Sequence, residues 1–185
     1  MRVVSLASGS SGNAILVDAG DTRILVDCGI GPRTLAKRLK AAGVAPESVS
    51  AVVVTHEHVD HTRGIPHALK RWPWTVIGSA GTLRAVRALG PLVRDRARLA
   101  RPHAQVGHLA IELVPVAHDA NEPTAVAVTD GVTGIRAGIA HDLGEPSEAL
   151  VRAFHGLDLL CIEANHDAGM LCSGPYPAYL KARIA

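Results

Sequence analysis

The chain has 185 residues, 48% of them hydrophobic, which is sufficient for a single domain, residues 1–185, with a substantial core. Its formal net charge of +2 neither favours nor excludes nucleic acid as a partner. Aromatic residues make up only 3% of the chain, which disfavours recognition of single strands by base stacking. Any contact with nucleic acid is therefore expected at its backbone.

The cysteines and the N-terminus indicate a reduced, cytoplasmic protein. Cys28, Cys161 and Cys172 are widely spaced and form no CxxC motif, which is typical of a protein without disulfides. The opening residues, MRVVSLASGSSGN, place no long apolar segment behind a basic start. We therefore expect neither a signal peptide nor a membrane span.

The hydrophobic patterning predicts strands at the start of the chain and strands mixed with helices after it. A helix beginning at Pro32 has Leu35 and Leu39 on one face and a stop signal at Gly43. The apolar run at 50–56 is typical of a strand buried on both faces. In chain order, the predicted strands are residues 2–8, 13–19, 22–29, 50–56, 75–79, 108–118, 124–130, 133–142 and 157–165. The predicted helices are residues 32–42, 80–90, 145–156 and 176–185.

This order of elements predicts an α/β (α+β) fold in which one sheet packs on another and helices lie outside. The helix over 145–156 begins either with Ser147 as its N-cap or with Pro146 in its first turn. Both residue types are common at helix starts, so the sequence leaves the choice open.

The segment LVRDRARLAR, residues 92–101, places Arg94, Arg96 and Arg98 at alternating positions. If the segment is extended, these arginines share one face. It is then either a solvated edge strand protected by its charge or a rim that contacts phosphates.

The segment THEHVDHTRG, residues 55–64, carries the strongest functional signal. His56 and His58 are two residues apart directly after an apolar strand, so both imidazoles face one point beyond the strand's end. Asp60 and His61 follow in a turn that enters a helix, and we expect them to face a neighbouring point. The segment thus predicts the beginning of two adjacent metal sites, with a spacing unlike that of HExxH on a helix.

Two further predicted strands end in residues of the same kinds. One ends at His118 and Asp119, the other at His141 and Asp142. Each places a ligand-type residue at a strand terminus, where a site at the sheet edge needs it. A carboxylate such as Asp142 is able to bridge two cations, and the mixed nitrogen and oxygen ligands suit Zn, Mn or Fe.

These motifs resemble the metallo-β-lactamase superfamily, whose HxHxDH signature is matched by THEHVDH. More narrowly, LASGSSGNAILVD, VAHDANEP, AHDLG and EANHDAGML resemble the YycJ/WalJ-like (VicX-like) branch. The resemblance runs from Ser5 to Ile184. HxHxDH alone indicates the superfamily, and its combination with SGSSGN and EANHD indicates the branch.

The resemblance implies a four-layer αββα sandwich with a dinuclear metal site at one edge. It implies a metal-dependent phosphodiester hydrolase, specifically a DNA 5′-to-3′ exonuclease that contacts DNA ends through their backbone. The implied ligands are His56, His58 and His118 for the first metal, Asp60 and His61 for the second, and Asp142 as the bridge.

The C-terminus departs from the branch. Its members normally continue beyond LKARI with a segment whose histidine completes the second metal site. We therefore expect the fold to lack its C-terminal part beyond Ala185 and the second site to be weakened.

Asp60 is expected to ligate a metal, to orient the attacking hydroxide and to accept its proton. His166 or His141 is the candidate acid for the leaving oxygen, or else each makes a structural hydrogen bond. Glu163 is expected to orient a metal-binding histidine. The predicted substrate contacts are Ser8, Ser11, Asn13, His141 and Asn165.

Several alternatives stay open at this point. The SGSSGN loop either binds phosphate oxygens through its N–H groups or is only a tight turn. Asn121 and Glu122 either shape the loop after His118 or face the substrate. Two other functions compete with the nuclease: a small-molecule hydrolase of the thioesterase or lactonase type, and a non-catalytic metal-binding fold.

Overall fold

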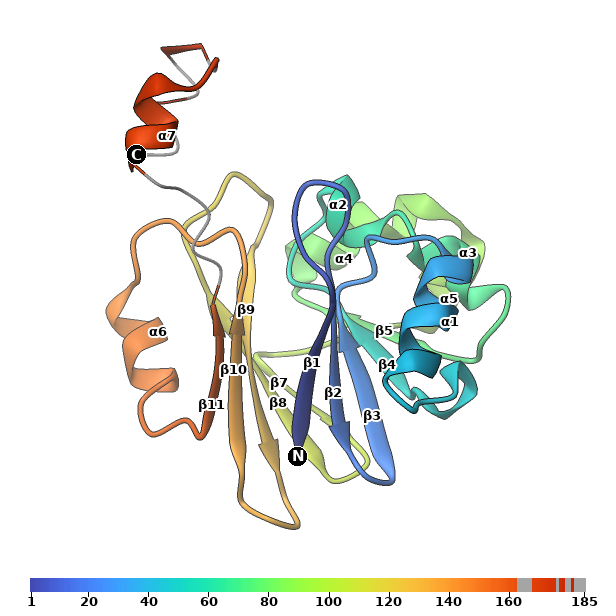
Figure 1. The fold of residues 1–185 in the computed structure, drawn as a ribbon. Coiled ribbons are helices and arrows are strands. Elements are labelled where there is room, and N and C mark those ends of the chain that lie inside the picture. The colour runs from blue at the N-terminus through green and yellow to red at the C-terminus, as the bar shows by residue number, and fades with distance from the viewer. Residues whose placement is uncertain (163–167, 176, 179–180, 182–185) are drawn as a thin grey trace.

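The computed structural model describes residues 1–162, 168–175, 177–178 and 181 of the chain. Two β-sheets lie face to face, with helices on both outer faces (Figure 1). The predicted four-layer αββα sandwich is therefore confirmed. No helix in the described part of the chain combines the length and apolar character needed to cross a membrane.

The elements follow the predicted order, with short helices added around the sheets. The strands are β1 (Arg2–Ala7), β2 (Ala14–Ala19), β3 (Thr22–Val26), β4 (Ala51–Val53), β5 (Thr75–Gly78), β6 (Ala97–Leu99), β7 (His103–Val106), β8 (Leu109–Pro115), β9 (Thr124–Asp130), β10 (Arg136–Ala140) and β11 (Leu159–Ile162). The α-helices are α1 (Pro32–Ala41), α2 (Val59–Thr62), α3 (Ile65–Leu69), α4 (Ala80–Val86), α5 (Pro91–Arg96), α6 (Glu148–Ala153) and α7 (Ala168–Ser173). Two 3-10 turns, η1 (Pro46–Ser48) and η2 (Arg87–Leu89), precede β4 and α5.

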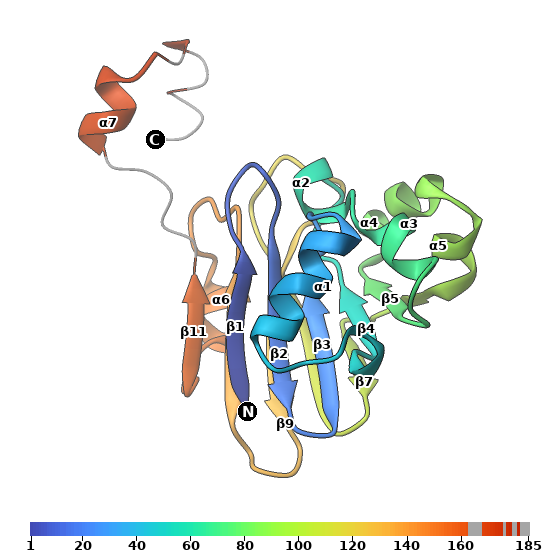
Figure 2. The same cartoon turned by 45° about the vertical axis from the view of Figure 1, so that its right-hand side comes forward.

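The first sheet has the strand order β1-β2-β3-β4-β5-β6. Its first three strands are antiparallel neighbours, and β3 to β6 run parallel. The carboxyl ends of β3, β4 and β5 therefore meet at one edge. That edge, where α2 lies in Figures 1 and 2, carries the loops in which most of the predicted ligands occur.

The second sheet has the strand order β11-β10-β9-β8-β7. Strands β7 to β10 are antiparallel neighbours, and β11 pairs with β10 in parallel. β8 leaves the sheet toward His118 and β10 toward Asp142. Both residues thus reach the same edge of the sandwich as the loops of the first sheet.

Three apolar clusters hold these layers together. The largest lies between the first sheet and the helices α1, α3, α4 and α5, and includes Leu35, Leu39 and the stacked Trp72 and Trp74. A second fills the space between the two sheets, where β-branched residues of β2, β3 and β4 meet β8 and β9. A small third cluster packs α6 on the second sheet through Leu150.

Two helix ends match the predicted signals. α1 begins at Pro32 and is followed by Gly43 with φ of +76°, the left-handed conformation that glycine adopts without strain. For α6 the structure decides between the two predicted starts, because the Ser147 side chain accepts a hydrogen bond from the Leu150 N–H.

The interpretation of residues 92–101 as an extended basic segment is wrong. Pro91 starts α5, so Arg94 and Arg96 lie on a helix and only Arg98 lies on the edge strand β6. The Arg96 guanidinium donates to the carbonyl oxygens of Leu69 and Trp72 at 3.0 and 2.7 Å. These arginines therefore do not form one basic strand face, and the second strand of this region, β7, was not predicted.

Candidate metal centre

The THEHVDH segment leaves β4 and enters α2 within a few residues. His56 is 1% exposed and His61 is fully buried, whereas His58 lies half-buried as the N-cap of α2. The Thr62 hydroxyl donates to the His58 carbonyl oxygen at 2.9 Å, which ties the end of this single helical turn to its N-cap. The predicted turn into a helix is thus confirmed, and it places Asp60 and His61 beside the two preceding histidines.

A first group of possible ligands is formed by His56, His58 and His118. Their ligand atoms all lie within 4.8 Å of one another. His118 Nε2 is 3.2 Å from His58 Nδ1, and the ring centroids of His56 and His118 are 4.8 Å apart. The structure therefore brings together the three residues predicted for the first metal.

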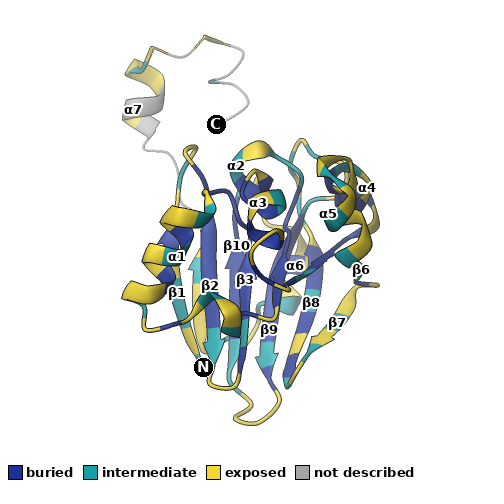
Figure 3. Ribbon diagram, turned by 90° about the vertical axis from the view of Figure 1, so that its right-hand side faces the viewer, coloured by how far each residue is buried: buried dark blue, intermediate teal, exposed yellow. Residues whose placement is uncertain are grey.

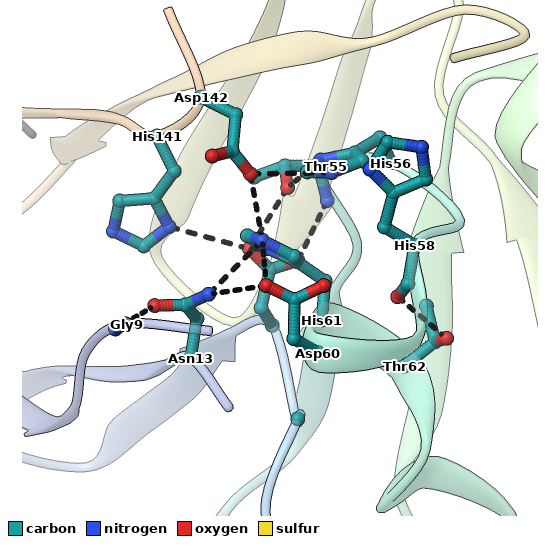
Figure 4. Close-up of polar contacts among 12 residues, drawn as sticks. Gly9, Asn13, Thr55, His56, His58, Asp60, His61, Thr62, His141 and Asp142 are labelled. Atoms are coloured by element: carbon teal, nitrogen blue, oxygen red, sulfur yellow. Dashed lines mark hydrogen bonds and ion pairs between the residues drawn. The ribbon is translucent and has the colours of Figure 1, made fainter. Parts of the chain in front are cut away.

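A second group shares His56 and adds His61 and Asp142. Asp142 Oδ2 lies 2.8 Å from His61 Nε2 and 3.3 Å from His56 Nε2, so it reaches both groups (Figure 4). Asp60 Oδ2 is 3.5 Å from His61 Nε2, with its side chain 24% exposed. The residues predicted for the second metal and for its bridge thus lie together, although their roles as ligands stay predictions.

The chemistry of these groups fits divalent cations. His56 Nε2 is buried and makes no hydrogen bond to any residue that the structure describes. Burial, together with the charge of His61, lowers the pKa of His56 to about 3, so its imidazole is neutral and able to bind a metal. The hydrogen bond from His61, against the effect of burial, lowers the pKa of Asp142 to about 2. Neutral imidazole and ionised carboxylate are the donors that Zn, Mn and Fe accept.

Asp27, which follows β3, was not predicted as a site residue, yet it lies beneath the centre. Its carboxylate is fully buried and accepts hydrogen bonds from the Thr55 N–H and hydroxyl at 2.9 and 2.8 Å. It also lies 2.8 Å from His61 Nδ1. This contact leaves His61 Nε2 facing Asp142, as a carboxylate behind a metal-binding histidine does.

Asp27 and His61 stabilise each other's charged forms. Burial alone would raise the pKa of Asp27, but the charge of His61 and the contact with His141 hold it well below its usual range. Burial likewise opposes protonation of His61, but Asp27 and Asp142 outweigh it and raise the pKa of His61 to about 10. Binding of a cation at His61 Nε2 therefore releases a proton.

We expect the stability of the metal-free protein to be greatest near pH 6.5. Above pH 6.5, His61 is deprotonated in the unfolded chain but stays protonated in the folded protein up to about pH 10. The free energy of unfolding therefore falls as the pH rises through this range. Below pH 6.5, His56 is protonated in the unfolded chain but stays neutral in the folded protein down to about pH 3. The free energy of unfolding therefore also falls as the pH is lowered. Each group contributes a slope of about 1.4 kcal/mol per pH unit.

Urea unfolding of chelator-treated protein at pH 5, 6.5 and 8.5 measures this dependence. A His61→Gln variant should lose the decline on the alkaline side. If the free energy of unfolding of the unsubstituted protein rises between pH 6.5 and 8.5, the charges assigned to His61 and Asp27 are wrong.

The SGSSGN loop is a tight turn fixed to the centre by Asn13. The Asn13 Oδ1 accepts from the Gly9 N–H at 2.9 Å, and its Nδ2 lies 3.0 Å from His61 Nε2 and 3.3 Å from Asp60 Oδ2. A Cβ on Gly29 would lie 1.5 Å from the Asp60 carbonyl oxygen, so the neighbouring loop requires glycine there. Asn13 is buried, whereas Ser8 and Ser11 are exposed at the rim.

The other predicted substrate and acid residues are placed as follows. His141 is buried, with its Nδ1 3.5 Å from Asp27 Oδ2, so it lies behind His61. Its role in substrate binding or proton donation stays a prediction. Glu163, Asn165 and His166 lie outside the described residues.

Asn121 and Glu122 shape the loop that carries His118. The Glu57 carboxylate accepts from the Asn121 N–H at 2.8 Å and from its side-chain amide. The Glu122 carboxylate accepts from the Gly81 N–H at the start of α4. Of the two readings left open by the sequence, the structure therefore supports a loop-shaping role.

Comparison with known proteins finds the fold described above and relatives in the family that the sequence motifs resemble. Residues 7–151 match the family model of the metallo-beta-lactamase superfamily. The exodeoxyribonuclease YycJ of Bacillus anthracis is 30% identical over 182 residues, which cover 97% of this chain and 68% of that protein. The chain belongs to the metallo-β-lactamase superfamily. Its histidine and aspartate groups are those of a metal-dependent hydrolase of this superfamily.

Two further similarities concern the sequence and the fold. The exodeoxyribonuclease WalJ of Streptococcus pneumoniae is 29% identical over 185 residues, with the same coverage of the two chains. The structure of Zn²⁺-bound PqqB from Methylobacterium extorquens superposes with a TM-score of 0.74 at 18% identity, covering 96% of this chain and 78% of that chain. At this identity the structural likeness shows the metallo-β-lactamase fold alone.

Proposed function

We propose that the chain is a metal-dependent phosphodiester hydrolase that removes nucleotides from DNA ends in the 5′-to-3′ direction. The observation that carries the proposal is the pair of adjacent ligand groups, which share His56 and are both reached by Asp142. A dinuclear centre is suited to phosphodiesters because two cations stabilise both the attacking and the leaving oxygen. The names of the two relatives near 30% identity support DNA as the substrate.

His56, His58 and His118 would hold one cation, and Asp60, His61 and Asp142 the other, with Asp142 shared between them. His56 Nε2, 3.3 Å from the shared Asp142 carboxylate, would lie beside both cations. When bound, such cations supply hydroxide near neutral pH and stabilise charge on the phosphate. Zn, Mn and Fe all accept this donor set.

The chain's own residues then orient the reacting groups. Asp60 is the partly exposed carboxylate at the mouth of the centre, where it is able to orient a water molecule and accept its proton. The Asn13 side-chain amide donates to Asp60 Oδ2 at 3.3 Å and so fixes this carboxylate relative to the SGSSGN loop. The exposed Ser8 and Ser11 place hydroxyl and N–H groups at the rim, where phosphate oxygens would lie.

Release of nucleotides from linear DNA tests the proposal. Mn²⁺-reconstituted protein is incubated with 5′-phosphorylated duplexes protected by phosphorothioates at either the 5′ or the 3′ end. We expect mononucleotides from every duplex except those with protected 5′ ends. An Asp60→Asn variant should be at least about 100-fold slower.

An Asp21→Asn variant is the matched control, because Asp21 is an exposed carboxylate in the β2–β3 turn. Its rate should equal that of the unsubstituted protein. If the protein cuts neither DNA nor RNA but hydrolyses a thioester or a lactone, the small-molecule hydrolase replaces the nuclease as its function.

A further inference from the structure

Positive charge is concentrated in one part of the chain. Residues 28–94 contain ten Arg and Lys residues and three Asp and Glu residues, whereas the rest of the chain contains nine and fourteen. The net charge of +2 therefore hides a strongly basic part and an acidic remainder. The basic part includes α1, α2, α3 and α4, which cover the outer face of the first sheet or its upper edge (Figure 3).

Within the described residues, none of the ten basic side chains forms an ion pair with a carboxylate. The arginines that do so, Arg2, Arg23 and Arg152, lie outside this part of the chain. Solvated cations without carboxylate partners leave a positive potential over the helices.

One row of these charges lies on α1. Arg33, Lys37 and Lys40 are spaced by four and three residues, so they share one helix face about 10 Å long. All three are exposed, while Leu35 and Leu39 on the opposite face are buried in the core. The first turn of α1 follows Gly29, which packs against the Asp60 backbone, so this row begins beside the candidate metal centre.

A second row follows α2 and α3. Arg63, which ends α2, donates to the Gly29 carbonyl oxygen at 2.6 Å and is itself exposed next to the centre. Lys70 and Arg71 are exposed at the other end of α3. Lys40 and Arg71 both line one groove of about 880 Å³, so the two rows meet at this groove.

Resting on the proposed nuclease function, we propose that these two rows form a track for the sugar–phosphate backbone of DNA, leading from the metal centre toward the groove between Lys40 and Arg71. The track consists of Arg33, Lys37, Lys40, Arg63, Lys70 and Arg71. Trp72, the aromatic residue of the groove, is 6% exposed, and its indole N–H donates to Glu47. The track therefore contacts phosphates rather than bases and does not select a sequence.

A charge-neutralised variant tests the track by binding. Arg33→Gln, Lys37→Gln and Lys40→Gln are combined, and the control combines Arg98→Gln, Arg101→Gln and Arg152→Gln, three exposed arginines elsewhere. Both triples are made in the Asp60→Asn background, so that the DNA stays intact. Fluorescence anisotropy with a 24-bp 5′-phosphorylated duplex is measured between 50 and 200 mM salt.

We expect the first triple to reduce the slope of log affinity against log salt by about 2 to 3. The affinity at 50 mM salt should fall at least about tenfold. The control triple should keep both values, and circular dichroism should show that both variants are folded. Equal affinities and equal slopes for the two triples would overturn the track.

Two further measurements separate the track from its alternatives. With Asp60 intact, hydrolysis of bis(p-nitrophenyl) phosphate by the first triple should equal that of the unsubstituted protein, because this ester does not reach the track. If the unsubstituted protein cuts neither this ester nor DNA, the nuclease function fails, while the difference in DNA binding still supports the track. If the first triple loses binding to vesicles that contain 30% phosphatidylserine but binds DNA as well as the unsubstituted protein does, the partner of the basic rows is a membrane surface and the DNA track is overturned.

Discussion

Replacing Asp27 by asparagine is expected to lower the free energy of unfolding by about 3–5 kcal/mol, the cost of removing one member of a buried ion pair. The reason is the number of donors that face this carboxylate. The Thr55 N–H, the Thr55 hydroxyl and His61 all lie within 2.9 Å of its oxygens. An amide keeps one acceptor oxygen and turns N–H donors toward groups that already donate.

The same substitution should also weaken metal binding, by about 10- to 100-fold, because His61 loses the partner that fixes its orientation and tautomer. Unfolding by urea and titration of Mn²⁺ into metal-free protein measure the two effects separately. Both measurements are made at a temperature at which the variant remains folded.

Asp130→Asn is a matched control for the loss of stability. Asp130 is a buried carboxylate of β9 that accepts from the Val132 N–H at 3.0 Å and from the Thr133 hydroxyl at 2.7 Å, and it contacts none of the predicted ligands. We expect it to destabilise the protein and leave metal affinity unchanged. If the two variants lose metal affinity equally, Asp27 has no specific role at the centre.

Replacing His56 by glutamine is expected to reduce phosphodiester hydrolysis by at least about 100-fold, since His56 belongs to both ligand groups. Metal binding should weaken at both groups. His58→Gln removes a ligand from one group only, so it should retain more bound metal.

The stability of the metal-free protein should also fall. The buried His56 imidazole has its Nδ1 3.0 Å from the Thr55 hydroxyl, so its removal should cost the metal-free fold about 1–3 kcal/mol. Elemental analysis of reconstituted protein and urea unfolding of metal-free protein check the two expectations. The control is His103→Gln, at an exposed histidine of β7. Full metal content in His56→Gln would remove His56 from the centre.

The sequence was sufficient to predict the groups at the centre because their signals are local. His56 and His58 follow one strand at a spacing of two, and His118 and Asp142 follow two other strands. The fold then only had to bring the strand ends to one edge, and the parallel pairing of β3, β4 and β5 contributes to this. The family resemblance predicted the same sandwich.

What the sequence did not predict depends on tertiary contacts. Asp27 is a single carboxylate after an apolar strand, and its importance arises only because β3 pairs with β4 and places it beside Thr55. The alternating arginines near position 96 suggested a strand. Pro91 and the carbonyl acceptors of the Arg96 guanidinium, which come from α3 and the turn after it, favour α5 instead.

The basic track also could not be predicted from the sequence. The whole-chain charge of +2 carried no information about nucleic acid, because acidic residues elsewhere cancel the charge of residues 28–94. The spacing of Arg33, Lys37 and Lys40 on α1 can be read from the sequence alone. Their relation to the metal centre became visible only when α1 and α3 were placed on the same layer of the fold.

The most direct test of the central claim is DNA hydrolysis by one preparation, measured before chelation, after removal of divalent metal, and after Mn²⁺ is restored. The account predicts that nucleotide release stops on chelation and returns with Mn²⁺ in the unsubstituted protein, and that it never returns in His56→Gln. Release that continues after complete removal of metal, or that returns equally in His56→Gln, would contradict it.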